Sequence, residues 1–135
     1  MPASSLRVGV DLVRIADVST SMARFGDRYA ERVFTDGERA YCVADEAHTA
    51  ERFAARFAAK EAAMKVLRPS PQDGISWRSI EVQRLPEGAC EITLHDAALA
   101  LARRAGVSEL SVSMSHEGEY AMATVVANVV GPVRR

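Results

Sequence analysis

Five ionisable side chains interrupt an apolar, alanine-rich stretch, RFAARFAAKEAAMKVL, that begins at Arg52. In a helix, Arg52, Arg56 and Lys60 would recur every four residues along one stripe. Glu61 and Lys65 continue the neighbouring stripe, which begins with two phenylalanines. A carboxylate beside a buried face must be paired or bind a cation, because leaving it bare is costly. The pattern favours either an ordinary i,i+4 ion pair between Glu61 and Lys65 or a site for a metal ion and a phosphate-rich ligand.

Asp11 is a second acid in unexpected surroundings. It lies within the β-branched segment LRVGVDLVRI, residues 6–15, which predicts a strand, although aspartate is depleted in strands. Gly9 shares its face and leaves room for something to approach the backbone. Asp11 could cap a following helix. Alternatively, Asp11 and Glu61 could share Mg²⁺, which prefers few carboxylates, several waters and substrate phosphates.

His116 follows the serine-rich face of a predicted strand, at the turn HEGE. It is either a structural or surface histidine or part of a binding site. The segment SMSH carries hydroxyls and an imidazole but lacks the GxSxG elbow of a Ser-His hydrolase. The sequence also has no Walker A or GxGxxG loop. Any phosphate must therefore be held by side chains rather than by a glycine-rich loop.

The elements that would position these side chains are a mixture of strands and helices. The strongest helix is predicted over residues 48–67, which contain no Gly or Pro and precede Pro69. Thr35 and Glu38 have the spacing of a capping box, within an interrupted helical region. The remaining predicted elements are a hairpin of strands 79–85 and 89–94, a helix over 95–106, and two alternating strands over 109–115 and 120–130.

This order of elements predicts an α+β fold with a mainly antiparallel sheet packed against helices, in a single domain over residues 1–135. Strand 6–15 is expected at the centre of the sheet, because both of its faces are largely apolar. Residues 1–6 and the closing GPVRR are expected to be loosely held.

Composition excludes several classes of function. The net charge is −1 and there is one Trp, so neither a basic field nor an aromatic platform points to nucleic acid. No apolar run approaches the roughly 18 residues needed to span a bilayer, and the N-terminus lacks a signal-peptide pattern. The two cysteines, Cys42 and Cys90, form no CxxC pair and are expected to be reduced thiols. We expect a cytoplasmic protein without a membrane or nucleic-acid partner.

Four segments, in order, resemble the small holo-acyl-carrier-protein synthases, the 4′-phosphopantetheinyl transferases of bacterial fatty-acid and polyketide synthesis. They are GVDLVRI, RYAERVFTDGE, RFAAKEAAMK and VSMSHEGEYAMA, and together they extend over nearly the whole chain. The resemblance implies the 4′-phosphopantetheinyl transferase fold. It also implies Mg²⁺-dependent transfer of 4′-phosphopantetheine from coenzyme A to a serine of an apo acyl carrier protein, giving holo-carrier and adenosine 3′,5′-bisphosphate.

The resemblance also implies roles for the acids and bases. Asp11 and Glu61 match the family's metal ligands, and Lys65 matches the residue that contacts the coenzyme A diphosphate, so Glu61 and Lys65 are the expected catalytic residues. Glu61 is the first candidate for the base that takes the serine proton, and Glu117 the second.

Further positions match residues that contact the two substrates. Arg56 and His116 match positions associated with the coenzyme A phosphates, with Lys60 a weaker member of that cluster. The carrier-binding positions are Arg28, Tyr29, Arg32 and, by a departure, Arg14. Many relatives are basic where this chain has Asp17, so either Arg14 substitutes or the carrier differs. The resemblance finally implies a homotrimer with active sites between subunits.

Three other functions compete with this one. A carrier-binding module without catalysis need not keep Asp11, Glu61 and Lys65 together, and all three are present. A Mg²⁺-dependent hydrolase of diphosphate bonds would need only water in place of the carrier serine. A structural or nucleic-acid-binding domain is disfavoured by the charge. The sequence leaves open which carrier is modified.

Overall fold

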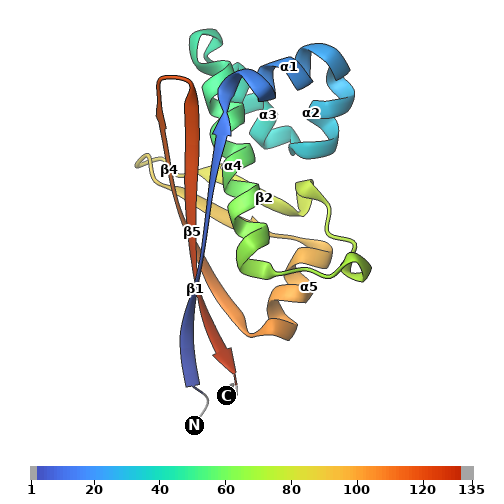
Figure 1. Ribbon diagram of the computed structural model, residues 1–135, viewed down its shortest axis with the longest axis vertical. Helices are drawn as coiled ribbons and strands as arrows, with labels where there is room; N and C mark the ends of the chain where they lie inside the picture. The colour runs from blue at the N-terminus through green and yellow to red at the C-terminus, as the bar shows by residue number, and fades with distance from the viewer. Residues whose placement is uncertain (1–2, 132–135) are drawn as a thin grey trace.

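A five-stranded antiparallel sheet and one long helix beside it organise the chain (Figure 1). The structure is a computed structural model and describes residues 3–131. The strand order is β1-β5-β4-β3-β2. In chain order the elements are β1 (Ala3–Arg14), α1 (Ile15–Phe25), α2 (Asp27–Val33), α3 (Asp36–Val43), η1 (Glu46–His48), α4 (Thr49–Leu67), η2 (Pro71–Asp73), η3 (Trp77–Ser79), β2 (Ile80–Arg84), β3 (Cys90–Leu94), α5 (Asp96–Ala105), β4 (Val107–Glu117) and β5 (Tyr120–Gly131).

Alanine allows α4 to lie close against the sheet. Five of its alanines are fully buried, and so are Ala121 and Ala123 on the facing side of β5. The closest approach is to β1, where a Cβ atom at Gly9 would stand 2.2 Å from the Ala62 carbonyl oxygen. Such a contact is possible only for glycine, because no real Cβ comes that near to backbone. The space expected beside Gly9 is thus filled by the backbone of α4.

The position of β1 was predicted wrongly. It pairs only with β5 and is an edge strand within this chain, not a central one. One of its faces covers α4, whereas the other exposes a row of large apolar side chains: Leu6, Val8, Val10 and Leu12. Both faces are largely apolar in the sequence, but only one is covered by the same chain.

The chain ends differ partly from expectation. Ala3–Leu6 belong to β1 and pair with residues 128–131 of β5, so this part of the N-terminal segment is not loose. Gly131 ends β5. Residues 1–2 and 132–135, which complete the two segments expected to be loosely held, lie outside the described residues.

The helix signals in the sequence are confirmed. The Thr35 hydroxyl accepts a hydrogen bond from the Glu38 amide at 3.1 Å, and the Glu38 carboxylate accepts one from the Thr35 amide at 2.8 Å, which completes the capping box. Helix α4 ends where Arg68 adopts a left-handed conformation, immediately before Pro69. The interrupted helical region separates into α1, α2 and α3, with Gly26 at the first break.

The second half of the chain also agrees closely with the prediction. Strands β2 and β3 form the expected hairpin, α5 follows, and β4 pairs with β5 along nearly its whole length. By contrast, β3 joins β4 through one residue pair, Glu91 with Ser111. Cys42 and Cys90 are free thiols. None of the helices within residues 3–131 is long and apolar enough to cross a lipid bilayer.

Candidate active site

Asp11 and Glu61 are brought together by the contact between β1 and α4. Asp11 is two residues from Gly9 on the face of β1 that covers α4, and Glu61 precedes the Ala62 carbonyl that Gly9 touches. Lys65 extends from α4 to β1, where its ammonium donates to the Val10 carbonyl at 2.7 Å and lies 3.3 Å from Asp11 Oδ1. Lys65 is therefore paired across the contact with Asp11. We call Asp11, Glu61 and Lys65 the acid cluster.

The simpler interpretation of Asp11 does not hold. Asp11 lies inside the β1 ladder, opposite Ala123 of β5, and the residue that precedes α1 is Arg14. Asp11 therefore does not cap a helix. Its carboxylate faces α4 and is mostly shielded from solvent, with 18% of the side chain exposed.

Like charges in the acid cluster affect the titration of Glu61. Burial raises the pKa of Glu61, the negative charge of Asp11 raises it further, and the positive charge of Lys65 opposes both effects. A divalent cation would relieve this repulsion. Within residues 3–131 no group of three or more His, Cys, Asp and Glu side chains could hold a metal ion. Two carboxylates fit Mg²⁺, which completes its shell with waters and substrate phosphates.

Tyr29 of α2 reaches the same region. Its pKa is raised by burial and by the negative charge of Glu61, and its ring packs edge-on against Phe34 at 6.4 Å between centroids. Helix α2, which carries the residues expected to bind the carrier protein, therefore places half-buried Tyr29 beside the acid cluster. Arg28 and Arg32 of the same helix are exposed.

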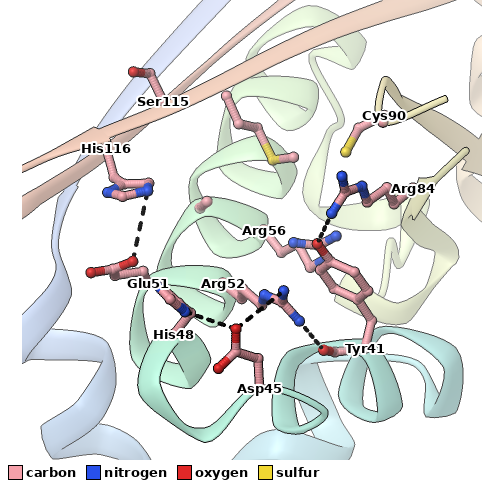
Figure 2. Close-up of a pocket in the computed structure, with 13 residues that line it drawn as sticks. Tyr41, Asp45, His48, Glu51, Arg52, Arg56, Arg84, Cys90, Ser115 and His116 are labelled. Carbon is pink, nitrogen blue, oxygen red and sulfur yellow. Dashed lines mark hydrogen bonds and ion pairs between the residues drawn. The ribbon is translucent and has the colours of Figure 1, made fainter. Parts of the chain in front are cut away.

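A separate cavity of about 370 Å³ collects basic side chains (Figure 2). It lies where η1, the first half of α4, the β2–β3 hairpin and the end of β4 meet. We call it the basic cavity. Its lining includes His48, Arg52, Arg56, Arg84 and His116.

Tyr41 holds the three guanidinium groups of the basic cavity together. Those of Arg52 and Arg56 lie 4.2 Å from the centre of its ring, within the range of cation–π attraction. Arg84 donates to the Tyr41 hydroxyl at 2.8 Å. Arg56 is only 3% exposed, and its Nε has no hydrogen-bond partner within the described part of the chain. A buried, incompletely paired cation of this kind favours an anionic ligand.

Two acids form ion pairs with basic side chains at the rim of the basic cavity. Glu51 lies 3.7 Å from His116 Nε2. Asp45 lies 2.8 Å from His48 Nδ1 and 3.8 Å from the Arg52 guanidinium (Figure 2). The arginines still outnumber these acids, so the cavity retains positive charge for a phosphate.

Lys60 has a different role from the one expected. Its side chain is fully buried, its ammonium pairs with Glu38 Oε1 at 2.8 Å, and it donates to the Trp77 carbonyl at 2.9 Å. Burial lowers the pKa of Lys60, while the charge of Glu38 opposes the shift. Because all of these partners are internal, we remove Lys60 from the phosphate cluster. Helical spacing placed Lys60 on a basic stripe but could not show that this stripe turns into the core.

The acid cluster and the basic cavity are distinct within one chain. Neither Asp11, Glu61 nor Lys65 lines the cavity. Arg56 and Glu61 are both on α4, but five residues along an α-helix correspond to a rotation of about 140°. The two groups therefore face different directions. Sequence reasoning did not assign Arg52 to the site and missed Tyr41, His48 and Arg84, which no motif marks.

The arginines expected to bind the carrier, Arg14, Arg28 and Arg32, are exposed, whereas Tyr29 is half-buried near Glu61. Arg14 connects β1 to α1 and lies 5.6 Å from the ring of Tyr120. Asp17 falls in the first turn of α1, where a negative charge suits the helix dipole. Glu117, the second candidate base, is exposed at the end of β4.

Comparisons with known proteins identify the family and the fold. Residues 7–125 match the 4′-phosphopantetheinyl transferase superfamily. The chain is 43% identical to a holo-[acyl-carrier-protein] synthase of Gloeobacter violaceus, over 93% of this chain and 92% of the relative. A holo-[acyl-carrier-protein] synthase of Koribacter versatilis is 40% identical, over 90% and 96%. The structure of the ACPS–CoA complex from Chronobacterium ammoniagenes superposes with a TM-score of 0.81 at 30% identity, covering 91% of this chain and 96% of that one.

Proposed function

This chain belongs to the 4′-phosphopantetheinyl transferase superfamily, as an enzyme of the holo-[acyl-carrier-protein] synthase type, and we infer that it transfers phosphopantetheine from coenzyme A to apo acyl carrier protein. The observation that carries the detailed proposal is the convergence of Asp11 with Glu61 and Lys65, from segments far apart in the sequence. A module that only bound the carrier would not need this arrangement.

The reaction is a displacement at phosphorus. The carrier serine oxygen forms a bond to the phosphorus that bears the pantetheine, and the bond from that phosphorus to the bridging oxygen breaks. Adenosine 3′,5′-bisphosphate leaves, and the serine proton passes to a base. Lys65 offsets the negative charge that grows on the leaving group. Glu61 is our first candidate for the base, because it belongs to the acid cluster where the diphosphate is proposed to lie, and Glu117 is the second.

Asp11 and Glu61 are the residues that would hold Mg²⁺. When bound, the ion neutralises the diphosphate and orients the leaving group. The support for this assignment is that the two carboxylates converge in the acid cluster, where burial and then the charge of Asp11 raise the pKa of Glu61 although Lys65 opposes them. Lys65 would then turn from Asp11 towards the diphosphate, which its exposed side chain allows.

The basic cavity is the proposed site for coenzyme A phosphates. Arg56 and His116 are the residues expected there, and Arg52 and Arg84 join them through Tyr41. The incomplete pairing of Arg56 supports an anionic ligand. The size of the cavity, about 370 Å³, suits one end of a nucleotide rather than the whole of coenzyme A.

Separation of the two sites supports a shared active site. The acid cluster of one subunit and the basic cavity of another would bind opposite ends of one coenzyme A molecule, in a homotrimer. The uncovered apolar face of β1, defined by Leu6, Val8, Val10 and Leu12, would be buried between subunits.

Carrier docking would use the exposed bases next to the acid cluster. Arg14, Arg28 and Arg32 suit an acidic carrier, because complementary charge steers encounter and fixes orientation. Tyr29 would lie between the docked carrier and Glu61. We place this activity in the cytoplasm, in fatty-acid or polyketide synthesis.

Intact-mass measurement tests the proposal. The purified protein is incubated with Mg²⁺, coenzyme A and a panel of apo carriers. The expected result is a carrier heavier by one phosphopantetheine, with adenosine 3′,5′-bisphosphate released. Breakdown of coenzyme A with all carriers unmodified would instead establish the diphosphate hydrolase, and no reaction with any of them would remove the assignment.

A further inference from the structure

A buried ion pair lies between α3, α4 and β2, and the proposed chemistry does not use it. Lys60 Nζ and Glu38 Oε1 are 2.8 Å apart, and neither side chain is accessible to solvent. Burying two opposite charges gains little stability over well-packed apolar side chains, because desolvation offsets their attraction. The pair therefore calls for an explanation beyond core stability.

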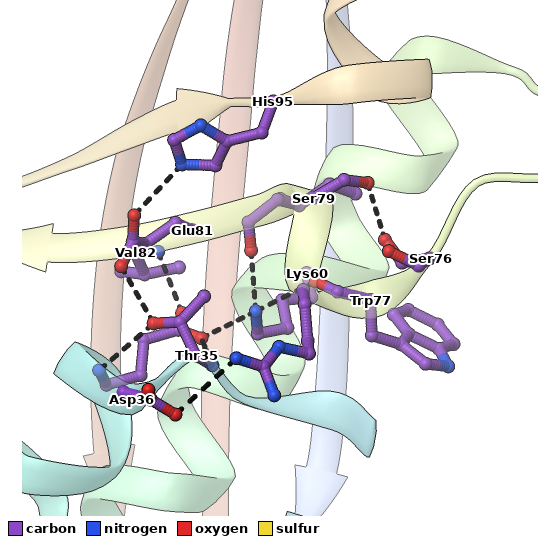
Figure 3. A network of polar contacts seen from close by, with 12 residues as sticks. Thr35, Asp36, Lys60, Ser76, Trp77, Ser79, Glu81, Val82 and His95 are labelled. Atoms are coloured by element: carbon purple, nitrogen blue, oxygen red, sulfur yellow. Dashed lines mark hydrogen bonds and ion pairs between the residues drawn. The ribbon is translucent and has the colours of Figure 1, made fainter. Parts of the chain in front are cut away.

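Each end of the ion pair also binds backbone of another segment (Figure 3). The Glu38 carboxylate accepts hydrogen bonds from the Thr35 amide and from the Val82 amide, both at 2.8 Å. The Lys60 ammonium donates to the carbonyls of Trp77 and Ile80. The start of α3, α4, η3 and β2 are thus joined at one point, in a single arrangement.

Arg78 extends this connection to α2. It follows Trp77 in η3, and its guanidinium donates to the Glu31 carbonyl of α2 at 2.8 Å and lies 3.5 Å from Asp36 Oδ1. The turn η3 is therefore bonded to α4 through Lys60 and to α2 through Arg78. We call Glu38, Lys60 and Arg78 the α2–α4 brace.

The two helices joined in this way carry the two halves of the transfer step. Helix α2 bears Arg28, Tyr29 and Arg32, which face the carrier in the proposed function. Helix α4 bears Glu61, which is adjacent to Lys60. The basic cavity contains none of the brace residues. A displacement of α2 against α4 would move the docked carrier relative to the acid cluster and leave the cavity in place.

We propose that Glu38, Lys60 and Arg78 are positioning residues, which fix α2 against α4 and thereby place the carrier serine at the reacting phosphorus. The proposal rests on the proposed function. It assigns the brace to the carrier half of the reaction and not to coenzyme A binding. Misplacement by about 1 Å can lower a rate about 100-fold, so a modest shift of α2 is enough.

Arg78 provides the first test, because its side chain is 42% exposed and its replacement leaves the core intact. The variants are Arg78→Ala and Arg78→Lys. The matched control is Arg104→Ala, which removes another exposed ion pair, 2.7 Å long, between α5 and η2. For each we would measure kcat/KM for the apo carrier, and the Kd of coenzyme A by calorimetry.

We expect Arg78→Ala to lower kcat/KM for the carrier about tenfold or more, with the Kd of coenzyme A unchanged within about twofold. Arg78→Lys should recover part of the loss, and Arg104→Ala should change neither quantity. Equal behaviour of Arg78→Ala and the control would overturn the proposal, as would an equal loss of coenzyme A affinity.

The buried pair provides the second test. The double variant Glu38→Leu/Lys60→Met removes both charges together and should lower the Tm, because the Val82 amide and the Trp77 and Ile80 carbonyls lose their partners. At a temperature where the variant is folded, transfer to the carrier should be low while the Kd of coenzyme A is kept. Full transfer by the folded double variant would show that the pair only stabilises the core. If the double variant does not fold, the Arg78 result decides.

Failure of the brace is distinguishable from failure of the proposed function. If the wild-type protein modifies no apo carrier, the function itself is wrong. If the wild-type protein modifies the carrier and the Arg78 variants do so equally well, only the positioning role is lost.

Discussion

Gly9 of β1 and Ala62 of α4 are in such close contact that a Cβ atom on Gly9 would lie 2.2 Å from the Ala62 carbonyl oxygen. Asp11 and Glu61 are neighbours of this contact along their own segments. The spacing of the two carboxylates therefore depends on the absence of one methyl group.

Gly9→Ala should separate the two acids, because the added methyl group must push β1 away from α4. We expect at least about a tenfold loss of transferase activity and a lower Tm. Activity assays at varied Mg²⁺ and thermal unfolding measure the two effects. Gly37→Ala is the control, because the nearest atom to a Cβ there is a side-chain oxygen at an ordinary 3.5 Å. Wild-type activity in Gly9→Ala would show that the spacing of the acids is unimportant.

Glu61→Gln should abolish most turnover yet stabilise the metal-free protein at neutral pH. An acid whose pKa is raised by folding binds protons more tightly in the folded state. The stability of the protein therefore falls as pH rises from the pKa of Glu61 in the unfolded chain through its raised pKa in the folded chain. Glutamine removes that penalty. The Tm of the variant should exceed that of the wild type at pH 7, and the difference should disappear at acidic pH, where Glu61 is protonated.

The effect of Mg²⁺ on the Tm provides a second test of Glu61. The ion should raise the Tm of the wild type clearly and that of Glu61→Gln little, because bound ligands stabilise the folded state. Glu87→Gln, at an exposed turn, should respond as the wild type does. Equal effects of Mg²⁺ on both Glu variants would remove Glu61 from the metal site.

Arg56→Ala should weaken coenzyme A binding more than it slows the chemical step. Hydrogen bonds to charged groups contribute about 1.5–3 kcal/mol, which corresponds to a loss of affinity of roughly 10-fold to 150-fold. Calorimetry gives the Kd, and kcat at saturating coenzyme A gives the rate. Arg103→Ala, on an exposed part of α5, is the control. A lower kcat with unchanged affinity would contradict the assignment of the basic cavity to phosphate.

Mixed subunits should recover activity from two variants that are each inactive at low coenzyme A. If active sites lie between subunits, Arg56→Ala and Glu61→Gln chains denatured and refolded together should form some interfaces with both residues intact. At a coenzyme A concentration well below the Kd of Arg56→Ala, activity should reappear in the mixture and not in either variant alone. Adding Val10→Lys to both chains should prevent recovery by placing a charge on the uncovered face of β1, whereas Val43→Lys, on another exposed surface, should not. Absence of recovery in oligomers confirmed by light scattering would place each site within one chain.

The two cysteines should differ in reactivity. Burial raises the pKa of Cys42 to about 12, so its thiol stays protonated and shielded. Cys90 is partly exposed and lines the basic cavity. Treatment of the native protein with a maleimide should add one label, on Cys90, and coenzyme A should slow the addition. Mass spectrometry of peptides identifies the labelled residue. Labelling of Cys42 at a comparable rate would show that the core opens readily.

Local patterns predicted the elements well, because their signals lie within a few residues of each other. The capping box of Thr35 and Glu38 is complete within one turn. The same patterns could not place Lys60, because its partner Glu38 is distant in sequence and the stripe does not show which side of α4 faces the core. Contacts that join separate segments, such as Arg84 with Tyr41, leave no periodic signal.

The position of β1 could not be predicted for a different reason. Apolar side chains on both faces of a strand indicate that both faces are covered, but they do not show which chain covers them. Val8 and Val10 are exposed within this chain. The inference from two apolar faces to a central strand therefore assumed that a single chain provides all of the packing.

The single residue pair between β3 and β4 has a mechanical consequence. The sheet is divided into a three-stranded ribbon, β1-β5-β4, and the β2–β3 hairpin, which pair within the described residues at Glu91 and Ser111, although Glu38 and Lys60 also join β2 to the helices. Arg84 belongs to the hairpin, and Arg56 belongs to the helix that packs on the ribbon. A phosphate bound by both Arg56 and Arg84 would link the hairpin to the helix. Bound cofactor should therefore reduce the motion of the hairpin relative to the ribbon at the β3–β4 junction, where the sheet has fewest paired residues.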